Sequence, residues 1–91
     1  MKTKSYIDPE LYLLRTVART LDGRHRQEIE SARFNLYAAF ESRDPDTARR
    51  WASTLRVGIL TMPSDTTDER TVRSAALAAL DTIDTAIGGG A

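Results

Sequence analysis

The stretch Glu41–Asp65, ESRDPDTARRWASTLRVGILTMPSD, lies between two proline signals and contains one amphipathic pattern. Its Asp44-Pro45-Asp46 is typical of a helix start, because an aspartate caps free amides, proline has no N–H to lose at the first helical position, and a further carboxylate suits the positive end of the helix dipole. Apolar residues follow at helical spacing: Ala48, Trp51, Ala52, Leu55, Ile59 and Met62. Pro63 then stops the helix. The stretch therefore predicts a helix of about 18 residues that begins near Pro45.

The chain before this stretch carries two more helical patterns. Asp8-Pro9-Glu10 repeats the start signal, with Asp8 as the expected cap, and the apolar stripe after it predicts a helix over about Pro9–Leu21. A second stripe, which ends at Phe40, predicts a helix over about Arg24–Ser42. Gly23 lies between the two stripes and is followed by a run of polar residues, so we expect the chain to break or kink there.

The second and third predicted helices are joined by a turn of only two or three residues. Short connections favour antiparallel neighbours, which predicts an αα-hairpin. After Pro63, Thr66 and Glu69 have the spacing of a capping box, and a stripe from Val72 to Ile87 predicts a fourth helix. No segment shows the alternation of a strand. The expected fold is all-α, a small bundle of three to four antiparallel helices with a central helical hairpin.

The length of 91 residues fits one domain. We divide it into an N-terminal extension (1–8), a helical bundle domain (9–87) and a flexible Gly-rich tail (88–91). A chain this short builds a thin core, so we expect self-association, with a dimer as the first expectation. The sequence has no apolar run of signal-peptide or membrane-spanning length, which predicts a cytoplasmic protein without a membrane partner.

Composition limits the chemistry open to this chain. It contains no cysteine, which excludes disulfides and thiolate sites, and its 13 basic and 13 acidic residues give a net charge of zero. The one histidine, His25, has Arg24 and Arg26 beside it, and the sequence contains no second histidine and no cysteine to act with it. A nucleophile with its base, or a metal site, needs such a second group. We therefore expect no catalytic residue, no metal and no cofactor, and we take Arg24, His25 and Arg26 as a candidate anion-binding patch.

Several helices have apolar arcs wider than one narrow stripe. Phe34 does not fit the stripe of Phe40, and Val57 flanks that of the third helix. Two interpretations are open: these helices are central in the fold, or an apolar patch is left for a partner. Trp, Tyr and Arg dominate binding hot spots, so the expected protein-interaction residues are Tyr37, Phe40, Arg49, Arg50, Trp51 and Arg56. The alternative interpretation is that Trp51 is a residue of the hydrophobic core.

Two classes of function remain. The sequence favours a small non-catalytic protein–protein interaction module, such as an adaptor, a chaperone-like subunit or an inhibitor of the kind that phage and plasmid genomes encode, which binds a protein partner or itself. The alternative is a nucleic-acid or nucleotide-binding regulator that uses the candidate anion-binding patch together with Arg49 and Arg50. The zero net charge, and the carboxylates of Asp44 and Asp46 where a recognition helix would face phosphates, count against this alternative.

Overall fold

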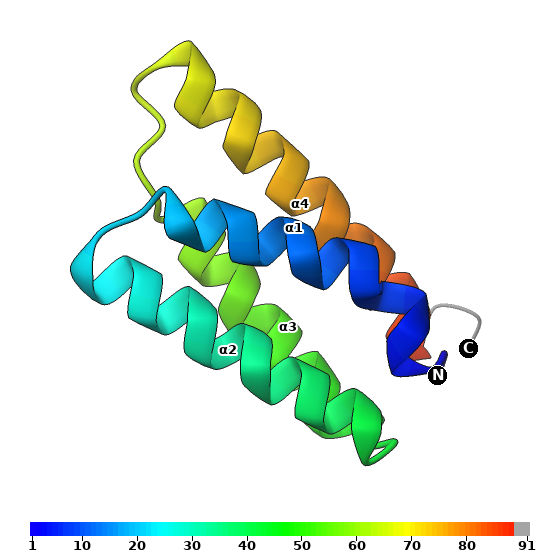
Figure 1. Ribbon diagram of the computed structural model, residues 1–91. Coiled ribbons are helices and arrows are strands. Elements are labelled where there is room, and N and C mark those ends of the chain that lie inside the picture. The colour runs from blue at the N-terminus through cyan, green and yellow to red at the C-terminus, as the bar shows by residue number, and fades with distance from the viewer. Residues whose placement is uncertain (89–91) are drawn as a thin grey trace.

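The computed structural model describes residues 1–88, in which a short 3₁₀ turn leads into four α-helices (Figure 1). The elements are η1 (Lys4–Ile7), α1 (Asp8–Arg19), α2 (Gly23–Glu41), α3 (Pro45–Leu60) and α4 (Thr67–Gly88). Within the described range there is no strand, and the predicted all-α bundle is confirmed.

The helices pack in a closed ring, in which α1 contacts α2, α2 contacts α3, α3 contacts α4 and α4 contacts α1. Consecutive helices α1, α2 and α3 run in alternating directions (Figure 1). The first turns of α4 stand away from the C-terminal end of α1, while its last turns lie beside the N-terminal segment (Figure 1). The bundle is therefore tight at one end and splayed at the other.

One apolar core fills the centre of the ring. Its largest fully buried side chains are Phe40, Ile7, Leu14, Ile29, Leu36, Leu55, Ile59, Leu80, Ile83 and Ile87. Among residues 1–88, none of the buried side chains is polar or charged. Burial of one such aliphatic side chain stabilises the fold by about 1.5–3 kcal/mol relative to leaving it exposed. Residues of all four predicted stripes therefore pack into one core within a single chain.

The break between α1 and α2 is confirmed at Gly23. This residue is the first of α2 and has φ of 51°, in the left-handed region that favours glycine. Arg26 closes the joint, because its guanidinium donates hydrogen bonds to the carbonyls of Ala18 (3.3 Å) and Arg19 (2.8 Å) at the end of α1. A cation at this position also suits the negative end of the α1 dipole.

The N-terminal extension expected over residues 1–8 is docked onto the bundle. The amide of Lys2 donates to the carbonyl of Ala86 (2.8 Å), and Ile7 is fully buried. The expected capping role of Asp8 is wrong. Because η1 runs directly into α1, Asp8 is already helical, and no side chain caps the first amides of α1.

The predicted hairpin of α2 and α3 is confirmed, and its turn is stabilised on both sides. Arg43 has φ of 56°, with its amide bonded to the Phe40 carbonyl (3.2 Å) and the Asp44 amide bonded to the Ala39 carbonyl (3.0 Å). This is the Schellman arrangement, with arginine at the position that glycine usually takes. Asp44 then caps α3 by accepting hydrogen bonds from the amide (3.1 Å) and hydroxyl (2.7 Å) of Thr47.

Close packing of the hairpin depends on Gly58, which is buried in α3. A Cβ on this residue would lie 2.7 Å from Cδ1 of Ile29 on α2, closer than carbon atoms normally approach. The absence of a side chain at Gly58 therefore lets the backbone of α3 come up against Ile29.

The start of α4 is the capping box that the sequence predicts. The hydroxyl of Thr66 accepts from the Glu69 amide (3.1 Å), and the Glu69 carboxylate accepts from the Thr66 amide (2.9 Å). At the other end α4 continues to Gly88, so this first residue of the expected tail is helical. The remainder of that tail, 89–91, lies outside the described residues.

We predict that Arg43→Gly raises the free energy of unfolding by about 0.5–1 kcal/mol, because glycine adopts the positive φ of this turn without steric cost. Ser42→Gly is the comparison, since Ser42 has a φ of −84° and its hydroxyl donates to the Ala38 carbonyl (2.7 Å), so glycine should lower the stability there. Chemical denaturation of the three proteins measures the effect. Equal or lower stability of Arg43→Gly than of the wild type would contradict the prediction.

Candidate functional site

Large hydrophobic side chains remain exposed outside the closed core. They are Tyr6 (50%), Tyr12 (69%), Phe34 (67%), Val57 (60%) and Leu60 (46%). The last three belong to the α2–α3 hairpin. Val57 and Leu60 are one turn apart and therefore neighbours on the surface of α3.

Phe34 and Val57 both point away from the core. Each lies two residues from a fully buried leucine, Leu36 on α2 and Leu55 on α3, which is about 200° around the helix. Arg50 precedes Val57 by seven residues, so the two share one side of α3. We call the set of exposed side chains on the hairpin, Phe34 on α2 with Arg50, Val57 and Leu60 on α3, the hairpin face.

A shallow depression of about 280 Å³ borders the hairpin face between α2 and α3. Its lining residues are Glu28, Ile29, Thr54, Val57, Gly58 and Thr61. Gly58 and Ile29 line this space beside the exposed Val57. The hairpin face thus offers an apolar side chain and a recess next to it.

The three aromatic residues expected to contact a partner are mainly structural. Phe40 is 1% exposed and belongs to the core, so it has no surface to offer. Trp51 and Tyr37 are half-buried and pack against the core. The ammonium of Lys4 also lies 5.1 Å from the centre of the Tyr37 ring, which helps to hold the N-terminal segment.

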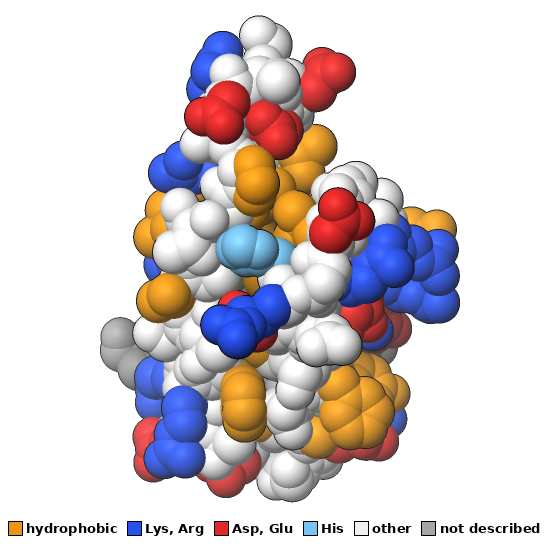
Figure 2. Space-filling model, turned by 90° about the vertical axis from the view of Figure 1, so that its left-hand side faces the viewer, with side chains coloured by type: hydrophobic (Ala, Val, Ile, Leu, Met, Phe, Trp, Pro, Cys, Tyr) orange, Lys and Arg blue, Asp and Glu red, His pale blue; other side chains and the backbone are white. Residues whose placement is uncertain are grey.

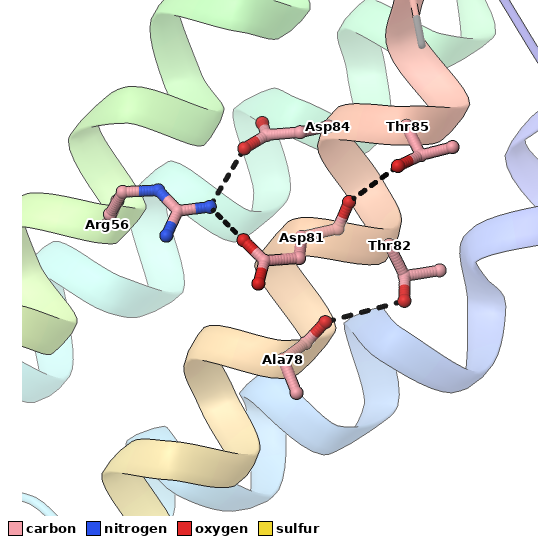
Figure 3. A network of polar contacts seen from close by, with 6 residues as sticks. All are labelled: Arg56, Ala78, Asp81, Thr82, Asp84 and Thr85. Carbon is pink, nitrogen blue, oxygen red and sulfur yellow. Dashed lines mark hydrogen bonds and ion pairs between the residues drawn. The ribbon is translucent and has the colours of Figure 1, made fainter. Parts of the chain in front are cut away.

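Arg56 joins α3 to α4. One guanidinium nitrogen donates to carboxylate oxygens of both Asp81 (2.9 Å) and Asp84 (2.8 Å), as Figure 3 shows. Hydrogen bonding to Asp81 and, to a smaller extent, to Asp84 raises the pKa of Arg56 above its ordinary value. The side chain is therefore engaged within the bundle.

The other two expected arginines differ in their surroundings. Arg49 donates to Asp46 (3.3 Å), and its guanidinium lies where a Cβ on Gly88 would be. Arg50 is exposed and forms no ion pair with the described residues. Of the three arginines expected on α3, Arg50 is the one open to an outside carboxylate.

The candidate anion-binding patch is not brought together by the fold. Arg26 bonds the end of α1, Arg24 is exposed, and His25 turns toward a cleft. Three consecutive residues of a helix point in directions about 100° apart, which explains this divergence.

The cleft beside His25 lies at the splayed end of the bundle and has a volume of about 420 Å³. Its lining comes from the α1–α2 joint, the end of α3 and the first turns of α4: Thr20, Leu21, Asp22, His25, Met62, Pro63, Asp68, Glu69 and Val72. Figure 2 shows the histidine next to hydrophobic side chains, with acidic side chains above it and basic side chains below it. We call this cleft the end cleft. Sequence reasoning missed it, because three distant segments form it.

Across residues 1–88, no three histidine or carboxylate side chains are grouped as metal ligands, and no helix has the length and apolar character to cross a membrane. Comparisons with protein-family models, curated proteins and solved structures give no match to this chain.

We predict that acid weakens the fold partly through Glu69. Hydrogen bonding from the Thr66 amide is the main cause that lowers the pKa of Glu69 below its ordinary value of 4.5. A lowered folded-state pKa means that the ionised carboxylate stabilises the fold above the ordinary pKa, and that this contribution is lost as the pH falls through the folded-state value. The unfolding free energy of Glu69→Gln should therefore fall less steeply than that of the wild type between about pH 6 and pH 3.

The control is Asp65→Asn, which removes a neighbouring carboxylate that accepts no capping bond. Chemical denaturation at a series of pH values measures all three proteins. Parallel profiles for Glu69→Gln and the wild type would contradict the assigned role of Glu69.

Proposed function

We propose that this chain is a non-catalytic protein–protein interaction module that binds a protein partner through the hairpin face. The observation that carries the proposal is that Phe34 and Val57 are 67% and 60% exposed. Neither residue belongs to the hydrophobic core. Neighbouring exposed apolar side chains, such as Val57 and Leu60 on α3, are typical of interaction sites. As part of the same proposal, the expected compartment is the cytoplasm.

The chemistry of the hairpin face suits a protein surface. Phe34, Val57 and Leu60 supply apolar area, and Arg50 supplies a planar fork of donors for a partner's carboxylate. Aromatic and arginine side chains are over-represented among residues that dominate binding energy. The depression beside Val57 has room for an apolar side chain of the partner. The partner that fits is a protein surface with an apolar ridge and a nearby carboxylate, and a second copy of this chain is one form that it could take.

The nucleic-acid alternative has less support. Several arginines that the sequence makes available to phosphates are engaged within the chain, as Arg26, Arg49 and Arg56 show. The net charge of zero adds no long-range attraction for a polyanion. Low sensitivity of binding to salt would separate the apolar hairpin face from a phosphate-binding surface.

The proposal predicts position-specific crosslinking from the hairpin face in cells. A photo-crosslinking amino acid at Val57 should give a discrete covalent adduct with a protein. The same amino acid at Ser74, an exposed site on α4, is the matched control and should not give that adduct. Adding Leu60→Asp should reduce the adduct at position 57 by about fivefold or more, because a carboxylate disfavours apolar burial.

Light scattering over a concentration series completes this test, because it detects a partner that is a second copy. An adduct or an assembly that depends on Leu60 supports the proposal. A chain that stays monomeric and gives the same crosslinking pattern from positions 57 and 74 would overturn it.

A further inference from the structure

We propose that the end cleft binds an aliphatic ammonium ion, with the alkyl chain on the apolar floor and the ammonium among the carboxylates at the rim. This inference goes beyond the proposed function and does not depend on it, because no residue of the hairpin face lines the end cleft.

The floor of the cleft is apolar and built from separate segments. Leu21 at the α1–α2 joint and Met62 after α3 are 7% and 5% exposed, and the half-buried Val72 adds the first turns of α4. The volume of about 420 Å³ lies in the usual range of about 300–1,000 Å³ for small-ligand pockets. An alkyl chain of several methylenes can therefore be covered there.

The charged side chains around this floor are acidic. Asp22, Asp68 and Glu69 line the cleft, and no lysine or arginine does. Within residues 1–88, Asp22 and Asp68 form no ion pair, whereas Asp81 and Asp84 share Arg56. Two carboxylates without a cation, at the mouth of an apolar recess, are electrostatically complementary to a cation rather than an anion.

The combination of floor and rim favours an amine with an alkyl chain over a bare metal ion. The described residues hold no cluster of side chains that fits metal coordination. Long cationic side chains bury their methylenes on apolar surfaces and keep the charged end in contact with water. The end cleft has the matching arrangement, an apolar floor with carboxylates at its rim. An ammonium also has three hydrogen-bond donors, which suits a rim of carboxylates.

The test is a titration of the isotope-labelled protein with n-pentylamine, followed by the NMR shifts of its amides and methionine methyl groups. The expected result is saturable shifts confined to residues of the end cleft, such as Leu21, His25 and Met62. Hexanoate is the matched probe, because it has a similar alkyl chain and the opposite charge, and it should cause no saturable shift.

Two variants connect the binding to the carboxylates. Asp22→Asn and Asp68→Asn should each weaken the binding of n-pentylamine by about twofold to fivefold, the range for an exposed charge pair. Asp65→Asn removes a carboxylate of the α3–α4 connection that does not line the cleft, and it should leave the affinity unchanged. Asparagine is a good residue for a helix start, so the folds of these variants should be retained.

A second probe identifies the source of the amine. Tighter binding of Nα-acetyl-lysine methylamide than of n-pentylamine would assign the cleft to a lysine side chain of a protein, and the reverse order would assign it to a free amine. Equal shifts with hexanoate, shifts that do not saturate, or unchanged affinity of both variants would overturn the proposal. None of these results would affect the crosslinking expected from the hairpin face.

Discussion

The close approach of α3 to α2 at Gly58 is the contact on which the rest of the structure depends. Ile29 is 1% exposed and occupies the space that any side chain at position 58 would need. Extra atoms forced into a packed core typically cost about 1–3 kcal/mol. The hairpin of α2 and α3 therefore requires glycine here, and the same Gly58 and Ile29 line the recess beside Val57.

The other elements attach to this hairpin through specific polar contacts. Arg26 bonds the end of α1, Lys4 bonds Glu41 at the end of α2, and Arg56 bonds two aspartates of α4. All of these pairs are at least partly exposed, so they align helices whose association is driven by the core rather than by the ions. The first turns of α4 lie beyond the reach of Arg56, and their divergence opens the end cleft.

Much of the fold could be predicted from the sequence, because apolar periodicity and capping residues act locally. The stripe that contains Leu55, the turn before Asp44 and the capping box at Thr66 all appear in the structure where these signals place them. The prediction that Asp8 caps a helix is wrong, because the Asp8-Pro9 pair carries no information about the 3₁₀ turn η1, which precedes it and continues into α1. A local signal cannot specify what its upstream neighbours do.

The candidate surfaces were less predictable, for a geometric reason. Periodicity shows that Phe40 and Phe34 differ in direction, but it does not show which of the two a neighbouring helix covers. Residue type favoured Phe40 and Trp51 as contacts, whereas packing buries the first and half-buries the second. The end cleft could not be foreseen from local patterns, because Leu21, Met62 and Val72 become neighbours only when three segments meet.

Native-state hydrogen exchange of the backbone amides tests most directly the claim that the hairpin organises the bundle. If the hairpin organises the bundle, the slowest amides should be in the middle of α2 and α3, near Leu36 and Ile59, and should exchange only through global unfolding. Amides of the first turns of α4, beside the end cleft, should be the least protected of those in the four helices. Two results would show that the hairpin does not organise the bundle. One is protection of these α4 turns equal to that of α3, and the other is local opening of the hairpin at a free energy well below that of global unfolding.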